Sequence, residues 1–344
     1  MSSSSPVVDA VLGLDIGKTR IHGVLLCGTQ ALRRKAVANT VAGHQELLAW
    51  LSQQRFTQLH ACLEATSTYG HAIAKQLHHA GYGVTIANPQ AVHAYAQSRL
   101  SRTKTDAADA RLIAEYCRDL KPELWQPPAP EVEVLQNLMR RVQALEQMIG
   151  QETNRLETAP PELVSEINTH ITFMEDQLKA LRDKIRTHID QFPGLKRQHE
   201  LLDSIPGIGP HTAALILAEI GSWQHFASAR QLAAYAGLTP QEKTSGTSMH
   251  GKPRLCKLGN ARLRKALFLP ALCLLRWSKP IQAWRAQLLQ RHKTKRQVVG
   301  AVMHKLIRWI YGFCTPINLL TPRSASRPHR LDTCNFAQYL QLND

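Results

Sequence analysis

The first ninety residues alternate short apolar runs with polar turns. Five of these runs have the length of a strand: 8–15, 21–27, 31–38, 60–63 and 84–87. Apolar residues spaced by three and four positions predict helices at 43–53 and 69–79. Three consecutive strands followed by alternating helices and strands favour an antiparallel meander that continues into a parallel α/β sheet.

The pattern changes after a stiff linker at 126–130, in which three prolines prevent a helix. Two series of apolar residues spaced by three and four follow, on either side of a break at Ala159-Pro160-Pro161: Leu135, Leu138, Val142, Leu145 and Ile149, then Ile167, Ile171, Met174, Leu178, Leu181 and Ile185. They predict two long helices that form a coiled-coil hairpin or a dimerisation arm. An intramolecular helical bundle is the open alternative.

These patterns divide the chain into four expected segments. An α/β domain occupies 1–126, a helical coiled-coil hairpin occupies 131–192, and a mostly helical domain occupies 199–320. The remaining segment, 321–344, is rich in Ser, Pro, Arg and His where it begins, and we expect it to be flexible.

The charge is distributed unevenly along the chain. The 344 residues carry a net charge of +16, from 42 basic and 26 acidic residues. The 89 residues from Lys243 to Leu331 contain nineteen Lys and Arg but no Asp or Glu, which leaves 23 basic and 26 acidic residues elsewhere. Such a surface suits a polyanion, and nucleic acid is the usual one, because each phosphate contact releases counterions. An acidic protein partner or a solvated basic face is the alternative.

Other features argue against membrane and secreted classes. The longest apolar run, Ala266–Leu275, contains Pro270 and is too short to span a bilayer, and Met1–Pro6 lacks the basic start of a signal peptide. The seven cysteines form neither a CxxC pair nor a zinc spacing, so we expect reduced thiols. A cytoplasmic protein, associated with the nucleoid of a prokaryotic cell, fits these features and the charge. The scattered histidines suggest surface or packing roles rather than metal ligation.

Four carboxylates have the positions of a possible metal site. Asp15 ends the first predicted strand and Glu64 the fourth, and these strands are neighbours in the expected sheet. Asp106 and Asp109 are three residues apart and therefore share a face of the next helix. Oxygen ligands at this density suit Mg²⁺ or Mn²⁺, which phosphodiester chemistry uses to stabilise the attacking and leaving oxygens. Taken singly, each acid has another possible structural role, such as a helix cap or a surface ion pair.

Three short stretches resemble a known family. Leu14-Asp15-Ile16-Gly17-Lys18, Leu63-Glu64-Ala65-Thr66 and Lys104–Ala110 are similar to the DEDD motif of insertion-sequence transposases related to the Piv DNA invertase. The family includes bridge-RNA-guided recombinases. The resemblance implies a RuvC-like domain of RNase H type over residues 1–126. It also implies that Asp15, Glu64, Asp106 and Asp109 bind Mg²⁺.

A glycine-rich turn begins the third segment. The stretch Ser204–Gly221 carries Gly207 and Gly209 just before an amphipathic helix. Backbone amides of such a turn approach a phosphate closely, and the helix start adds positive dipole. The pattern resembles a helix-hairpin-helix, which holds the DNA backbone without reading bases. The alternative is a tight turn between helices.

A second resemblance to the same family follows, over Tyr235–Pro240 and Lys257–Arg264. In the family a serine before a glycine, between these stretches, is the nucleophile, and the matching residue is Ser245. Thr244 stands where many members have a first serine, and Ser248 is the second candidate. A hydroxyl needs activation, and metal bound by the four acids would supply it if the two domains dock.

Basic residues accompany these motifs. We expect nucleic-acid contacts from the glycines and from eight basic residues: Arg102, Lys104, Lys252, Arg254, Lys257, Arg262, Arg264 and Lys265. Four aromatic residues lie among or after them, and we expect them mainly in the core: Trp277, Trp284, Trp309 and Tyr311.

The sequence therefore predicts a DNA transposase or recombinase in which Ser245 forms a covalent phosphoserine intermediate. Family resemblance implies a structured non-coding RNA as guide, and helical pairing suggests a dimer, or a tetramer when two duplexes recombine. One alternative is a metal-dependent RuvC-like nuclease that uses water as nucleophile. Another is a nucleic-acid-binding protein without catalytic activity.

Overall fold

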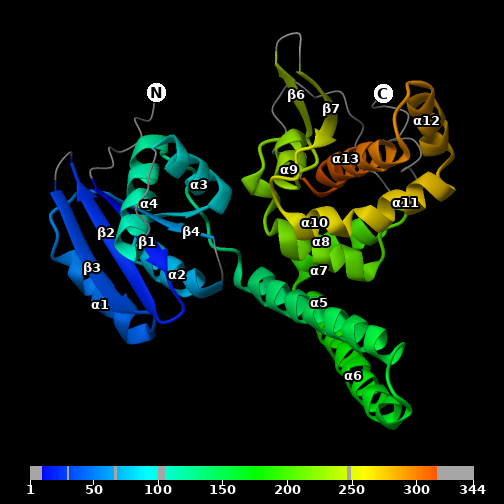
Figure 1. The fold of residues 1–344 in the computed structure, drawn as a ribbon, viewed down its shortest axis with the longest axis horizontal. Helices are drawn as coiled ribbons and strands as arrows, with labels where there is room; N and C mark the ends of the chain where they lie inside the picture. The colour runs from blue at the N-terminus through cyan, green and yellow to red at the C-terminus, as the bar shows by residue number, and fades with distance from the viewer. Residues whose placement is uncertain (1–9, 29–30, 66–67, 100–104, 246–248, 316–344) are drawn as a thin grey trace. The chain divides into compact units, whose positions relative to one another are not determined.

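The computed structural model describes residues 10–28, 31–65, 68–99, 105–245 and 249–315, with the backbone alone at 31, 242–245 and 249–253. The chain forms two compact units, Met1–Pro127 and Pro128–Asp344. Among the described residues, the first unit contains a five-stranded sheet and four α-helices, and the second contains nine α-helices and a two-stranded hairpin (Figure 1). Nothing among the described helices is both long and apolar enough to cross a membrane.

The first unit is built on a mixed sheet. Its strands are β1 (Ala10–Ile16), β2 (Arg20–Cys27), β3 (Ala31–Ala38), β4 (Leu59–Glu64) and β5 (Gly83–Ala87), in the order β3-β2-β1-β4-β5. β2 runs antiparallel to β1 and β3, whereas β4 runs parallel to β1 and β5. The expected meander that continues into a parallel sheet is therefore present. This order and these directions are those of an RNase H-like domain, which confirms the expected fold class.

Two helices cover each face of the sheet. α1 (Val41–Ser52) and α2 (His71–His79) pack on one face, and α3 (Pro89–Ser98) and α4 (Asp106–Leu120) pack on the other. The central strand β1 is buried from Ala10 to Leu14, which explains its continuous apolar run. Apolar side chains on both faces therefore contribute to two separate core clusters.

The second unit begins with two long helices that pack against each other, α5 (Pro130–Leu156) and α6 (Pro161–Gln191) (Figure 1). The predicted apolar positions Val142, Leu145, Met174 and Leu178 are buried in the core of this unit. The pairing seen here is intramolecular. Dimerisation through this hairpin stays a prediction.

The rest of the second unit is mostly helical, as expected. Its helices are α7 (Pro193–Asp203), α8 (Pro210–Ile220), α9 (Ala229–Tyr235), α10 (Ala261–Ala266), α11 (Phe268–Trp277), α12 (Lys279–Gln290) and α13 (Lys295–Cys314). They share one core with α5 and α6. Strands β6 (Pro240–Ser245) and β7 (Met249–Leu255) form a hairpin that stands out from these helices (Figure 1). The sequence did not predict this hairpin, because its strands are polar and lack alternating apolar residues.

One of the aromatic assignments was wrong. Trp309 and Tyr311 are buried and Trp284 packs against the core, but Trp277 is 74% exposed, with the Arg276 guanidinium 5.0 Å from its ring. Trp277 is the last residue of α11, where the helix ends and no neighbouring described element covers it. The expected flexible tail, 321–344, lies outside the described residues.

Candidate active site

Asp15 and Glu64 lie side by side at the edge of the sheet formed by the carboxyl ends of its parallel strands β1 and β4. In the parallel pairing of β1 with β4, Leu14 is the register partner of Leu63, so the next residue on each strand is an acid. Both side chains are half-buried. The expectation that these two strands are neighbours is correct, and it accounts for the proximity of two acids that are 49 positions apart.

A glycine allows α4 to approach this edge. A Cβ atom at Gly13 would lie 2.1 Å from the Ala110 carbonyl oxygen and 2.3 Å from the Ala114 amide nitrogen, so the α4 backbone packs directly on β1. Gly13 is two residues before Asp15. Close packing at this point therefore brings the first turn of α4, with Asp106 and Asp109, toward Asp15.

The start of α4 suits two acids. Thr105 is the N-cap, and its hydroxyl oxygen accepts a hydrogen bond from the Ala108 amide at 3.2 Å. Asp106 and Asp109 both lie in the first turn, where the helix dipole stabilises negative charge. The local structure thus offsets part of the repulsion between these carboxylates and the others.

The carboxylates act on one another electrostatically. Burial raises the pKa of Asp15 above its ordinary value, and the charges of Asp106 and Asp109 raise it further. Burial also raises the pKa of Glu64, with added repulsion from Asp15 and Asp109. The four acids predicted as a site are therefore gathered in one region of the first unit.

Two histidines and an asparagine also belong to this region, although the sequence analysis did not select them. His22 faces Asp15 across the β1–β2 pairing, and its Nε2 lies 3.3 Å from Asp106 Oδ2. His93 on α3 acts on Glu64, whose pKa it lowers in part. Asn39 Nδ2 donates to the Gly17 carbonyl oxygen at 2.9 Å and holds the turn after Asp15. Only His22 had a signal in the sequence, namely its register in the hairpin of the first two strands.

The donor chemistry fits a hard divalent cation, although the side chains do not form a closed chelate. Carboxylate oxygens are the ligands that Mg²⁺ and Mn²⁺ prefer, and their mutual repulsion here is the kind that a cation relieves. Within the described ranges, no three His, Cys, Asp or Glu side chains are grouped closely enough to hold one ion. Asp106 is 68% exposed and is directed at His22. Metal ligation by these four acids stays a prediction.

The predicted nucleophile lies in the second unit. Ser245 is the last residue of β6 and pairs with Met249 of β7, close to the end of the hairpin. The structure describes the backbone of Ser245 and Lys252 but not their side chains. Arg102, Lys104 and Ser248 lie outside the described residues.

The predicted nucleic-acid contacts differ in their surroundings. Arg254, Lys257 and Lys265 are exposed. Arg262 contacts Glu219 (Nη1 to Oε1, 3.4 Å), and Arg264 donates to the Ala236 carbonyl oxygen at 3.0 Å. The two arginines therefore have partners within the unit, whereas the first three are available to a polyanion.

The glycine-rich turn joins two helices, α7 and α8, as the sequence suggested. Gly207 has φ +87°, and a Cβ there would lie 3.0 Å from the Cys273 side chain, so the turn packs against α11. Gly209 is the N-cap of α8 and has open space around its Cα. The backbone amide of Gly209 therefore suits a phosphate contact better than the backbone amide of Gly207 does. Both assignments stay predictions.

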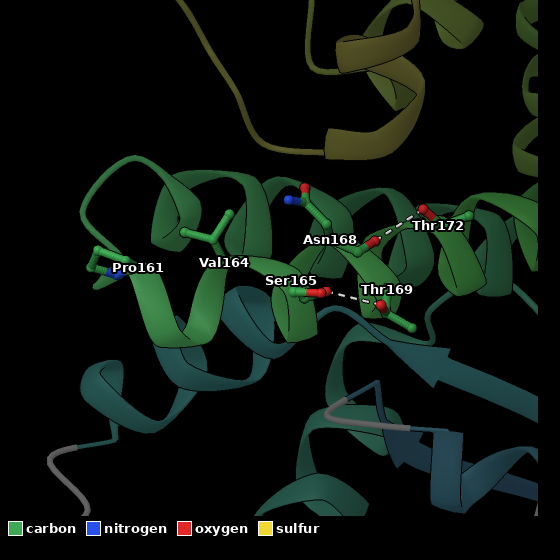
Figure 2. Close-up of a pocket in the computed structure, with 6 residues that line it drawn as sticks. All are labelled: Pro161, Val164, Ser165, Asn168, Thr169 and Thr172. Atoms are coloured by element: carbon green, nitrogen blue, oxygen red, sulfur yellow. Dashed lines mark hydrogen bonds between the residues drawn. The ribbon is translucent and has the colours of Figure 1, made fainter.

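A shallow pocket on α6 offers no reactive chemistry. Figure 2 shows its lining residues, which are Pro161, Val164, Ser165, Asn168, Thr169 and Thr172. The Thr169 and Thr172 hydroxyls donate to the carbonyl oxygens of Ser165 and Asn168, at 2.8 and 2.9 Å. None of these described lining residues is ionisable, so the acidic edge of the sheet is the better candidate for the active site.

Comparison with known proteins gives the family. A model of the IS110 DEDD type, described as "Transposase", matches residues 12–160, which include the four acids. A model described as "Transposase IS116/IS110/IS902 family" matches residues 199–286, which include the hairpin. The chain belongs to this family of transposases. It is therefore an enzyme of the class that cleaves and rejoins DNA, which confirms the resemblance seen in the sequence.

Two relatives that match most of the chain agree with this assignment. The pilin gene-inverting protein of Moraxella bovis is 33% identical over 304 residues, which are 88% of this chain and 94% of that protein. A probable family 20 transposase of Pseudomonas aeruginosa is 26% identical over 92% of this chain and 98% of that protein. The solved structure of Thermus thermophilus RuvC aligns with 34% of this chain and 99% of its own, at 16% identity and a TM-score of 0.27.

Proposed function

We propose that this transposase cuts DNA by attack of the Ser245 hydroxyl on a backbone phosphate, assisted by a divalent metal site of Asp15, Glu64, Asp106 and Asp109. The observation that carries the proposal is the packing of α4, whose first turn carries Asp106 and Asp109, against β1 and β4, whose ends carry Asp15 and Glu64. Repulsion from neighbouring acids raises the pKa of Asp15 and of Glu64, in addition to the effect of burial. Carboxylates perturbed in this way cluster at functional sites, and a bound cation would relieve their repulsion.

The acids have a defined task in this proposal. A Mg²⁺ or Mn²⁺ ion, when bound, neutralises the phosphate and stabilises the attacking and leaving oxygens. Asp15 and Glu64, at the ends of β1 and β4, would hold the cation together with Asp106 and Asp109 from the first turn of α4. His22, 3.3 Å from Asp106, orients that carboxylate.

The serine step conserves the energy of the bond that it breaks. Ser245 Oγ forms a bond to phosphorus and loses its proton, while one phosphorus–oxygen bond of the DNA backbone breaks and the leaving oxygen gains a proton. A DNA hydroxyl then attacks the phosphoserine in the reverse sense. Strands are rejoined without ATP, because each step exchanges one phosphodiester for another.

Several partners follow from the proposal. DNA is the substrate of the class, and the exposed basic residues Arg254, Lys257 and Lys265 supply phosphate contacts. A structured non-coding RNA as guide is proposed from family resemblance. A dimer through the α5–α6 hairpin, or a tetramer on DNA, would bring two duplexes together. Association with the nucleoid follows from DNA binding.

Trapping of the covalent intermediate tests the serine. The full chain, purified with any RNA that accompanies it, is incubated with Mg²⁺ and a supercoiled plasmid that carries its coding element and flanking DNA. After denaturation, the plasmid is expected to retain covalently attached protein. Ser245→Ala is expected to lose this adduct, and Ser245→Cys is the conservative variant. An adduct that persists in Ser245→Ala, but not in Ser248→Ala, would transfer the role to Ser248.

The alternatives predict other results. If Ser245→Ala still cleaves the plasmid and the wild type forms no adduct, water is the nucleophile and the chain acts as a nuclease. If Asp106→Asn and Asp109→Asn leave the DNA-dependent activity unchanged, the metal site is refuted. Sequencing of the nucleic acid that copurifies with the wild type tests the proposed RNA: a recurrent structured transcript supports it, and DNA alone contradicts it.

A further inference from the structure

The β6–β7 hairpin needs support from outside its own two strands. A two-stranded sheet alone is marginally stable in water, and among the described strands β6 and β7 pair only with each other. Ser245 lies five residues beyond Pro240 on β6, which at about 3.3 Å per residue is ~17 Å from the base of the hairpin. A rotation of ~10° at the base would thus move the serine by ~3 Å, and a 1 Å misplacement can cost ~100-fold in rate. The base therefore decides where the serine lies.

Backbone contacts join the two chain segments at this base. The amides of Cys256 and Lys257 donate to the carbonyl oxygens of Thr239 and Gly237, at 2.9 and 3.2 Å. Gly259 has φ +131°, and a Cβ there would lie 2.3 Å from the Tyr235 carbonyl oxygen. The stretches before and after the hairpin are thus in direct backbone contact.

Side chains connect this base to α8. Asn260 Nδ2 donates to Glu219 Oε2 at 2.8 Å and to Tyr235 Oη at 3.2 Å. The Tyr235 hydroxyl donates to the Glu219 carbonyl oxygen at 3.1 Å. The Asn260 amide also donates to the Tyr235 carbonyl oxygen at 2.6 Å, and its Oδ1 caps α10 by accepting from Leu263. Both polar atoms of the Asn260 side chain are therefore engaged.

Glu219 supplies a carboxylate to a basic stretch that has none of its own. The 89 residues from Lys243 to Leu331 contain no acid, so the carboxylate that Arg262 contacts comes from outside that stretch. The Glu219 side chain is 11% exposed, and both of its oxygens have partners, Arg262 and Asn260. A largely buried acid is retained only where it is bonded in this way. Its partners belong to the stretch that leaves the hairpin.

We propose that Glu219, Tyr235 and Asn260 form a clamp that positions the hairpin carrying Ser245, so that they are positioning residues for DNA cleavage. This inference rests on the proposed role of Ser245. β6 begins shortly after Tyr235 and β7 ends shortly before Asn260, so the clamp joins the two ends of the hairpin. Helix α8, which is part of the core of the unit, anchors the clamp through Glu219. Loss of the clamp should leave DNA binding intact while the hairpin changes direction.

Asn260→Asp is the sharpest test. Asp is as good an N-cap as Asn, so α10 keeps its cap. The variant loses the two hydrogen bonds that Asn260 Nδ2 donates, to Glu219 and to Tyr235, and it places a second carboxylate beside Glu219. We expect faster hydrogen–deuterium exchange of the amides in 240–255, with unchanged exchange in α5 and α13. We also expect formation of the plasmid adduct to slow by at least ~10-fold, with plasmid affinity within twofold of the wild type.

A second variant reverses the polarity of the contact. When Glu219→Gln is combined with Asn260→Asp, the side-chain amide introduced on α8 donates to the carboxylate introduced at the start of α10. The link is therefore restored with donor and acceptor exchanged. We expect the double variant to recover the protection of the hairpin amides from exchange. We also expect it to recover at least half of the lost rate of adduct formation, measured on a logarithmic scale. Asn168→Asp, the same change at an exposed position of α6, should match the wild type in every assay.

The outcomes separate the clamp from the proposed chemistry. Unchanged exchange in 240–255 of Asn260→Asp would overturn the clamp, as would faster exchange throughout the second unit or a double variant without recovery. Exchange does not depend on the identity of the nucleophile. If Ser245→Ala retains the adduct while Asn260→Asp still loosens the hairpin, the serine assignment fails and the clamp remains a structural fact of the hairpin.

Discussion

At the scale of single residues, the acidic edge shows how position determines chemistry. Asp15 and Glu64 are ordinary carboxylates that burial and repulsion have shifted to a higher pKa. His22 and His93 oppose part of that repulsion, since His22 lowers the pKa of Asp15 and His93 lowers that of Glu64 in part. A metal ion would relieve the rest. The stability of the first unit should therefore respond both to removal of one acid and to added Mg²⁺.

Asp15→Asn tests this balance. In a chelating buffer, the variant should melt at a higher temperature than the wild type, because one member of the repelling set is gone. Added Mg²⁺ should raise the melting temperature of the wild type more than that of the variant, since binding to the folded state stabilises it. Plasmid cleavage should fall on the order of 10²–10³-fold.

Asp176→Asn is the matched control for Asp15→Asn, because Asp176 is an exposed residue of α6. It should leave the melting temperature, the effect of Mg²⁺ and the cleavage rate unchanged. A lower melting temperature of Asp15→Asn in chelating buffer, or an equal Mg²⁺ effect in both proteins, would contradict the metal site.

At the scale of elements, one close contact aligns the helix that carries two acids with the strand that carries a third. α4 approaches β1 so closely at Gly13 that no other side chain fits without a shift of backbone. The helix itself was expected from the sequence, with Asp106 and Asp109 on one of its faces. Its position was not, because a glycine in a strand does not reveal which helix will pack against it.

Gly13→Ala tests this contact. The added methyl group would lie 2.1 Å from the Ala110 carbonyl oxygen, so α4 must move away from β1. We expect a loss of about 2 kcal/mol in the free energy of unfolding, measured with urea, from overpacking. The effect of Mg²⁺ on stability should also decline, because Asp106 and Asp109 move with α4.

Gly150→Ala is the corresponding control in α5, where nothing lies within 4 Å of the added Cβ. It should be neutral or stabilise by up to about 1 kcal/mol, since alanine favours a helix over glycine. A Gly13→Ala protein with wild-type stability and an undiminished Mg²⁺ effect would show that α4 does not depend on this contact.

At the scale of the whole molecule, the residues of the proposed chemistry are divided between the two units. The acids belong to the unit of Met1–Pro127, and Ser245 and the stretch without acids belong to the unit of Pro128–Asp344. Some of the basic residues in that stretch are used internally, as Arg264 is by the Ala236 carbonyl oxygen. The net charge of +16 therefore overstates the number of cations available to DNA.

The salt dependence of DNA binding separates these two uses. The slope of log K against log salt is negative, and the double variant Arg254→Gln with Lys265→Gln should reduce its magnitude by ~2, at about 0.9 per lost phosphate contact. Arg264→Gln should lower the melting temperature and leave the slope unchanged. Fluorescence anisotropy with a labelled duplex measures the slopes, and a thermal melt measures the stability. Equal slopes in the double variant and the wild type would exclude Arg254 and Lys265 from the interface.

The sequence by itself determined the strands of the first unit, its helices α1, α2 and α4, the long helical pair, the positions of the four acids and the family, but not α3. These depend on local periodicity and on short motifs, which the chain carries whatever its neighbours are. Tertiary structure decided which residues meet: His22 with Asp106, α4 with Gly13, and Glu219 with Asn260. Each pair unites residues far apart in the chain, or residues whose side chains give no local signal. The polar hairpin that carries Ser245 was missed for the same reason, because its support comes from packing at its base rather than from a pattern within its strands.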